Sequence, residues 1–381
     1  MDFRLTEEQI QIRDIARKFA VQEITPLAAE IDESSKFNWP LHRKMGELGL
    51  IGMTVPEEMG GGGLDTLSWC LVIEEIAKAS TAVSNYLTLS ESMLNYISHL
   101  GSEDQREKYL APIIDGELVC SFAMTEPNAG SDAGAIQATA KLEGDHYVLN
   151  GQKMFITMAL QADLFVVVAN VNPGLGKDGI RTFLVPKNTP GLSLGKQLDL
   201  MGIRGTEAAP VYLEDCRIPK ENLLGSADGF ENVMKGMDGP GRLGAASQAL
   251  GLAEAAFDAA MAYAQERSQF GRVIYTFQDI KFILAEMSTE IEAARGLIYK
   301  AAWRRDHGLS YTKETSQAKL FAGKMCVRQV SNAMQILGGY SYSKEYPMER
   351  FYRDAKIHQI WDGTDQVQKI IIAKELLKEM K

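Results

Sequence analysis

The hydrophobic pattern of the chain changes character twice, and this order constrains the fold more than any other feature. Residues 1–120 carry apolar side chains at helical spacing, as at Ile12, Ile15 and Phe19. Over residues 121–230, β-branched and aromatic residues come in short runs bounded by turn residues, which is typical of strands. Helical patterns, many of them rich in alanine, return over residues 231–381. The sequence therefore predicts a mostly α fold in which a central antiparallel β-barrel or sandwich separates two helical domains.

The charge and composition of the chain exclude several functional classes. It has 40 Lys and Arg against 50 Asp and Glu, a formal charge of −10, whereas a nucleic-acid binder needs a basic surface. The longest apolar runs, such as 164–169, are far shorter than the roughly 20 residues that cross a bilayer, so we expect no membrane span. The first residues lack the apolar segment of a secretory signal, which predicts a cytoplasmic protein.

The cysteines and histidines give no sign of a disulfide or a metal site. The four cysteines are far apart and form no CxxC pair, and the five histidines form no HExxH or HxH pair. We therefore expect buried thiols and no bound metal.

Residues 239–244, GPGRLG, fit the GxGxxG pattern of dinucleotide-binding folds. That motif binds a dinucleotide only where it directly follows a β-strand. The preceding residues 230–237 have a helical pattern, so we interpret the stretch as a joint between two helices.

Three segments carry residues suited to cofactor or substrate binding. The loop at 125–132 (TEPNAGSD) is rich in hydroxyls and small residues, and such a loop either presents donors to a phosphate or flavin edge or is simply a turn. Arg267 lies at a helix end, where an arginine is a phosphate ligand or a solvated charge. Asp362 lies between Trp361 and a glycine, and it is either a helix N-cap or a functional carboxylate.

Five motifs, taken in order, resemble the signatures of the acyl-CoA dehydrogenase family over essentially the whole chain. They are TEPNAGSD at 125–132, NGQKMFIT at 150–157, ERSQFG at 266–271, QILGG at 335–339 and WDGTDQVQ at 361–368. The resemblance implies an N-terminal helical domain, a middle β domain and a C-terminal four-helix bundle, assembled as a homotetramer. It also implies an FAD-dependent enzyme that oxidises an acyl-CoA substrate and passes electrons to an electron-transfer flavoprotein or a similar acceptor.

The resemblance also assigns roles to individual residues. In the family's reaction a carboxylate removes the Cα proton beside the thioester while a hydride leaves Cβ for the flavin, and Asp362 stands at the position of that base. The implied FAD contacts are Phe122, Met124, Thr125, Ser131, Phe155, Thr157, Arg267, Gln278, Gln335, Gly338, Gly339, Thr364 and Gln366. Of these, Arg267, Gln278 and 335–339 would hold the pyrophosphate and adenosine end across a subunit boundary. The implied substrate contacts are Ser131, Asp238, Arg242, Trp361 and Gly363, with the amide of Gly363 or its neighbour facing the thioester carbonyl.

Two departures from the family pattern bear on the substrate. Most members carry glutamate where this chain has Asp362, so its carboxylate lies about 1.5 Å, one C–C bond, further back. The extra room favours a branched or alicyclic acyl group, such as cyclohexanecarboxyl, over a slim linear one. Asp238 and Arg242 are separated by one residue more than is usual in the family, which leaves the role of Asp238 open.

Glu91 raises a second possibility for the chemistry. It falls in a predicted helix that borders the acyl pocket in the family, where it faces either solvent or the acyl group. In the second case it would be a base for 1,4-dehydrogenation of a cyclohexene carboxyl-CoA. The remaining alternatives are a short-chain linear acyl-CoA dehydrogenase, a flavin oxidase, an enoyl-CoA reductase that runs in reverse, and a non-catalytic acyl-CoA-binding relative.

Overall fold

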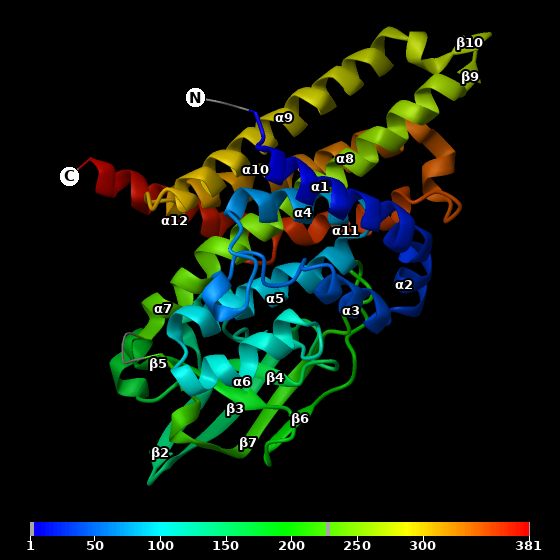
Figure 1. Ribbon diagram of the computed structural model, residues 1–381. Coiled ribbons are helices and arrows are strands. Elements are labelled where there is room, and N and C mark those ends of the chain that lie inside the picture. Colours follow the sequence, from blue (N-terminus) through cyan, green and yellow to red (C-terminus); the bar gives the residue numbers. More distant parts are fainter. Residues whose placement is uncertain (1–3, 226–228, 381) are drawn as a thin grey trace.

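The helices from the two ends of the chain pack together, and the β sheet lies at one end of the body they form (Figure 1). The computed structural model describes residues 4–225 and 229–380, apart from the side chains at 232 and 235–238. The predicted order of helices, strands and helices is confirmed, as is the mostly α fold class with a central β domain.

The N-terminal part is a set of helices with two of them at its buried centre. Its α-helices are α1 (Glu7–Phe19), α2 (Ala28–Ser34), α3 (Trp39–Glu47), α4 (Thr66–Ala79), α5 (Thr81–Leu100) and α6 (Glu103–Ile114). Helix α4 packs on α8 (Arg242–Glu266), and α5 contacts both α8 and strand β1 (Cys120–Ala123). Helix α5 therefore joins the helical body to the sheet.

The middle part is an eight-stranded sheet in the order β6-β7-β3-β2-β4-β5-β8, with β1 paired to β4. Its other strands are β2 (Thr139–Glu143), β3 (His146–Ile156), β4 (Leu164–Asn170), β5 (Ile180–Pro186), β6 (Leu192–Leu194), β7 (Ala209–Pro219) and β8 (Leu223–Leu224). Most neighbours are antiparallel, as predicted, but β4 runs parallel to both β1 and β2. All seven residues of β4 are buried, which explains its continuous apolar run.

The described C-terminal part contains four long α-helices and two short ones of eight residues each. Its elements are α7 (Gly229–Gly236), α8, a hairpin of β9 (Ser268–Gln269) and β10 (Arg272–Val273), α9 (Gln278–Asp306), α10 (Thr312–Leu337), α11 (Met348–Ala355) and α12 (Asp365–Glu379). The GPGRLG stretch lies in a π-helical turn, Met237–Gly241, and the start of α8, so its interpretation as a joint between helices is confirmed. Helix α11 was not predicted.

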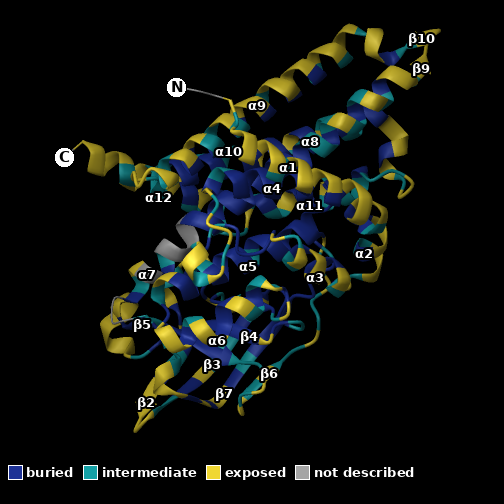
Figure 2. Ribbon diagram, viewed as in Figure 1, coloured by how far each residue is buried: buried dark blue, intermediate teal, exposed yellow. Residues whose placement is uncertain are grey.

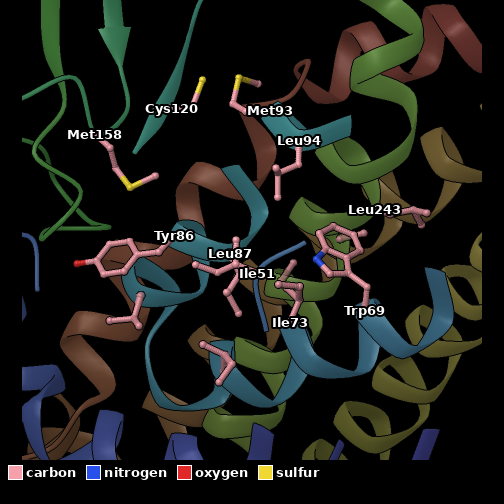
Figure 3. Packing of buried hydrophobic residues seen from close by; sticks show 14 of the residues in the cluster. Ile51, Trp69, Ile73, Tyr86, Leu87, Met93, Leu94, Cys120, Met158 and Leu243 are labelled. Atoms are coloured by element: carbon pink, nitrogen blue, oxygen red, sulfur yellow. The ribbon is translucent and has the colours of Figure 1, made fainter. Parts of the chain in front are cut away.

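One apolar core runs from the helices into the sheet. Figure 3 shows Trp69 of α4, Tyr86 and Met93 of α5, Leu243 of α8 and Cys120 of β1 within it. Burial is greatest along α4, α5 and β4, whereas α9 and α12 expose most of their surface (Figure 2). All four cysteines are buried free thiols, as expected.

Two kinds of feature are absent from the part of the chain that the structure describes. None of its helices is both long and apolar enough to cross a bilayer. Among the same residues, no group of three or more His, Cys, Asp and Glu side chains is placed to hold a metal ion.

Candidate active site

Asp362 lies in a turn just before α12, and the backbone of this turn is left-handed at two consecutive residues. The φ angle is 49° at Asp362 and 89° at Gly363. A Cβ atom at Gly363 would lie 2.7 Å from Nε2 of Gln368, so only glycine fits this position without displacing its neighbour. Thr364 is the N-cap of α12, and its hydroxyl accepts a hydrogen bond from the Val367 amide.

Two buried side chains hold the carbonyl groups of this turn. Lys319 Nζ, from α10, donates to the Gly363 carbonyl at 2.7 Å. Gln368 Nε2 donates to the carbonyls of Gly363 at 2.8 Å and Asp362 at 3.0 Å. The sequence assigned no role to either residue, although Gln368 ends the motif at 361–368. A signal was present for Lys319, because it is a lysine on the same helix face as Thr315 and Ala322, where apolar or small residues are expected.

The charges around Asp362 tune its carboxylate. Burial raises the pKa of Asp362 to about 6, and the positive charges of Lys319 and Arg242 limit the rise. Burial lowers the pKa of Lys319 to about 8 and that of Arg242 to about 10. At neutral pH, Asp362 is therefore mostly ionised between two buried cations. It is partly accessible, and it is a stronger base than an ordinary aspartate.

Aromatic rings from three elements surround the same region. Tyr96 of α5 stacks on Phe122 of β1 with ring centroids 5.4 Å apart, and its hydroxyl donates to the carbonyl of Val233. Trp361 packs edge-on against His358 at 5.2 Å. Burial lowers the pKa of His358 to about 3, so this ring is a neutral support.

The loop at 125–132 is fixed to the sheet at its first residues and open beyond them. The Met154 amide donates to the Thr125 carbonyl at 2.8 Å, and Met124 is buried. Lys153 Nζ donates to Glu126 Oε1 at 2.7 Å, with both side chains buried. Ser131 is exposed, so its hydroxyl is accessible to a ligand.

Beside this loop, β3 presents an exposed aromatic ring. Phe155 has a φ of 59° and 61% of its surface is exposed, at an irregularity in the pairing of β3 with β7. The Thr157 carbonyl accepts a hydrogen bond from the Ser121 hydroxyl, which fixes this end of the strand beside β1. An exposed ring in a strained backbone conformation is typical of a binding surface.

A second candidate site lies at the other end of α8. Arg267, Gly338 and Gly339 line a groove of about 570 Å³, and the Arg267 guanidinium lies 5.6 Å from the Tyr340 ring centre. A Cβ atom at either glycine would meet nothing within 4 Å, so their backbone is open to a ligand. Gln278 and Gln335 are exposed.

The two sites are far apart within one chain. Arg242, whose charge acts on Asp362, is the first of the 25 residues of α8, and Arg267 directly follows the last. At 1.5 Å per residue the helix separates them by about 37 Å. The structure therefore brings Asp362 and Arg242 together and leaves Arg267, Gly338 and Gly339 in a separate group. Gln278 begins α9 and Gln335 lies in the last turn of α10, and neither lines the groove.

Comparison with known protein families decides the identity of the fold. Three family profiles match one after another along the chain. They are "Acyl-CoA dehydrogenase, N-terminal domain" over residues 6–117, the middle domain over 121–216 and the C-terminal domain over 227–377. The chain is a member of the acyl-CoA dehydrogenase family.

Similar acyl-CoA dehydrogenase-family proteins span the full length of the chain. The short-chain specific acyl-CoA dehydrogenase of Clostridium acetobutylicum is 43% identical over 99% of this chain and 100% of its own length. The caffeyl-CoA reductase-Etf complex subunit CarC of Acetobacterium woodii is 44% identical over 98% and 99%. The solved structure of butyryl-CoA dehydrogenase from Megasphaera elsdenii superposes with a TM-score of 0.96 at 40% identity, covering 99% of this chain and 100% of that one.

Members of the acyl-CoA dehydrogenase family are FAD-dependent flavoproteins, and the residues present here fit that cofactor. The exposed Phe155 ring offers a face to a flat ring system, next to the hydroxyl-rich loop. The groove beside Arg267 offers a guanidinium and open glycine backbone, which suit a pyrophosphate.

Glu91 is buried and hydrogen-bonded to nearby residues of the protein, whereas a second base would need a free carboxylate facing the acyl group. The two carboxylate oxygens of Glu91 accept hydrogen bonds from the amides of Gly52 and Thr54 at 3.1 and 2.8 Å and from the Thr54 hydroxyl at 2.6 Å. Such a satisfied carboxylate holds the 52–54 segment against α5. The side chain of Asp238 lies outside the described residues, and Gln366 is exposed on the first turn of α12.

Proposed function

We propose that this acyl-CoA dehydrogenase-family enzyme binds FAD and an acyl-CoA thioester, and that Asp362 removes the Cα proton as a hydride leaves Cβ, giving an enoyl-CoA. Bound FAD would accept that hydride. The observation that carries the proposal is the position of Asp362, a partly accessible carboxylate with a raised pKa on a turn held by buried donors.

The surroundings of Asp362 suit proton removal from a carbon next to a thioester. A carbon acid is weak, so a base with a pKa of about 6 assists more than one near 4, provided that it is still ionised at neutral pH. The N–H of Gly363 has no acceptor among the described residues, while its carbonyl is held by Lys319 and Gln368. We propose that this amide, or that of its neighbour, donates to the thioester oxygen, on which negative charge develops.

We propose that the cofactor is shared between two copies of the chain. Phe122, Met124, Thr125, Ser131, Phe155, Thr157, Thr364 and Gln366 would line its flavin end, and Arg267, Gln278, Gln335, Gly338 and Gly339 its pyrophosphate and adenosine end. Because Arg267 lies about 37 Å from Arg242 along α8, one chain supplies only one end of a given site. The exposed Phe270 ring at the tip of the β9–β10 hairpin supports this arrangement, since it leaves an apolar surface for a partner. A homotetramer supplies such pairs.

We propose a branched or alicyclic acyl group, of the cyclohexanecarboxyl-CoA type, as the substrate. The shorter Asp362 side chain leaves space beside Cα, and a base displaced by about 1 Å from a slim substrate would lose roughly a hundredfold in rate. The aromatic surroundings of Tyr96, Phe122 and Trp361 suit an apolar ring.

Anaerobic titration of the flavin absorbance with cyclohexanecarboxyl-CoA and butyryl-CoA tests the substrate class. The wild type should be reduced faster by the ring substrate, and Asp362→Glu should move the preference toward butyryl-CoA because it restores the missing methylene. A wild type that prefers butyryl-CoA would remove the alicyclic proposal and favour a short-chain linear substrate, in keeping with the names of two similar proteins.

A second candidate is the reverse reaction, reduction of an enoyl-CoA. It is favoured by the 44% identity to a protein named as a caffeyl-CoA reductase subunit in a complex with Etf. In either direction we propose an electron-transfer flavoprotein as the electron partner. Rapid oxygen consumption on addition of substrate would instead identify an oxidase.

A further inference from the structure

Lys319 is a buried cation that donates a hydrogen bond to the carbonyl of Gly363, the residue after Asp362. None of the five sequence motifs includes it. We propose that Lys319 is a positioning residue for the reaction: it holds the Asp362–Gly363 turn in its left-handed conformation and places a buried positive charge next to the residue proposed as the base. This inference rests on the proposed role of Asp362 as the base.

Lys319 contacts the turn directly. Lys319 is 1% exposed, and its Nζ atom donates to the Gly363 carbonyl at 2.7 Å. Lys319 belongs to α10, whereas Gln368, the other donor to this carbonyl, belongs to α12 and lies only five residues from Gly363. Gln368 therefore shapes the turn locally, while Lys319 fixes it to a different helix of the core.

The backbone conformation of the turn is strained. A non-glycine residue rarely adopts a positive φ, and Asp362 does so at 49° next to Gly363 at 89°. Such strain persists only where surrounding contacts hold it. The side-chain donors shown to hold the two carbonyl groups are Lys319 and Gln368.

The charges around Asp362 come from several helices. Besides Lys319, the groups that act electrostatically on Asp362 are Arg242 from α8 and Tyr96 from α5. Asp365 from α12 and His358 from the segment Lys356–Gln359 act on Lys319 itself. His358 is neutral and Tyr96 is a phenol, so Lys319 and Arg242 are the cations that favour the charged form of Asp362. Since Lys319 keeps most of its charge below its pKa of about 8, its effect is present at neutral pH.

The test measures proton removal without hydride transfer. Phenylacetyl-CoA has an α hydrogen but no hydrogen on its β carbon, so exchange of the α hydrogen in D2O, followed by NMR, reports the base alone. The FAD-loaded enzyme is used at thioester concentrations at which the flavin absorbance shows saturation. The variants are Lys319→Met, Lys319→Gln and Lys319→Arg, with Lys324→Met as the control because Lys324 is exposed on the same helix.

A neighbouring cation lowers a carboxylate pKa by roughly 1–3 units. In Lys319→Met and Lys319→Gln, the acid limb of the pH–rate profile, where exchange falls as the base becomes protonated, should therefore lie about one pH unit higher than in the wild type. Lys319→Gln keeps a donor for the Gly363 carbonyl, so it tests the charge even if Lys319→Met does not fold. Lys319→Arg and Lys324→Met should keep the wild-type limb.

An acid limb that stays at the wild-type pH in Lys319→Gln overturns the inference about charge. Exchange in Lys319→Met that equals the wild type at every pH overturns the positioning role altogether. A wild type that binds the thioester but exchanges no α hydrogen, or an Asp362→Asn variant that exchanges normally, contradicts the proposed function instead, so the two failures are distinguishable.

Discussion

We expect the buried ion pair between Glu126 and Lys153 to stabilise the fold and to help retain the cofactor. Lys153 Nζ lies 2.7 Å from Glu126 Oε1 and 3.2 Å from the Met124 carbonyl. The Glu126 carboxylate also accepts hydrogen bonds from the amides of Gln137 at 2.7 Å and Ala138 at 2.9 Å. The pair thus connects β3 to both ends of the loop proposed to face the flavin.

Lys153→Met removes the cation and leaves the carboxylate buried. Breaking a buried pair in this way costs about 3–5 kcal/mol of unfolding free energy. The two amide donors remain, and each hydrogen bond to a charged group contributes roughly 1.5–3 kcal/mol, so the lower end, about 3 kcal/mol, is expected. In Glu126→Gln/Lys153→Met no uncompensated charge remains, although the new amide group meets one of the two backbone donors, so the loss should shrink to about 1–2 kcal/mol.

Urea unfolding of the FAD-bound protein, followed by circular dichroism and by flavin release, measures both effects. Flavin should leave Lys153→Met at a lower urea concentration than the wild type, because the loop loses its anchor. Lys141→Met is the matched control, since Lys141 on β2 forms a salt bridge at the surface with 77% of its side chain exposed, and it should cost about 1 kcal/mol or less. A loss below about 1 kcal/mol for Lys153→Met, or a double variant less stable than the single one, would refute the reasoning.

Three further predictions concern the catalytic turn and its neighbours. The rate constant kcat/KM should fall as pH drops through about 6, because protonated Asp362 cannot accept the Cα proton; a limb near pH 4 would contradict the raised pKa. Glu91→Gln should lower the unfolding free energy by about 1–3 kcal/mol, because its new amide group meets the Gly52 and Thr54 donors, and leave turnover unchanged; a large loss of kcat at unchanged stability would restore a catalytic role. Gly363→Ala should lower kcat by roughly a hundredfold, since its Cβ atom would displace the Gln368 side chain and a φ of 89° would be strained; equal kcat in wild type and variant would show that the turn tolerates movement.

The order of secondary structure could be predicted because each part has its own local pattern. Long alanine-rich periods marked α8, α9 and α10, and β-branched runs marked β4 and β5. The parallel pairing of β1 with β4 was not predicted, because strand partners far apart in sequence leave no local signal. Helix α11 was missed since its eight residues are too few to show a clear period.

The candidate site shows the same division between local and tertiary information. Asp362, Arg242 and Arg267 were found through motifs, and their catalytic and binding roles stay predictions. Lys319 was not found, because a lysine in a helical pattern usually faces solvent, and its burial depends on the turn before α12 packing against α10. The partners of Glu91 lie near residue 52, about forty positions away, so its structural role was equally invisible.

The central claim, that Asp362 removes the Cα proton, is tested most directly by α-hydrogen exchange in the Asp362→Asn variant. With phenylacetyl-CoA bound, the wild type should exchange its α hydrogen with D2O, and Asp362→Asn should exchange it at least about a hundredfold more slowly while it still binds the thioester, since a general base contributes roughly 10²–10⁴ in rate. Equal exchange rates in the two proteins would show that another group is the base.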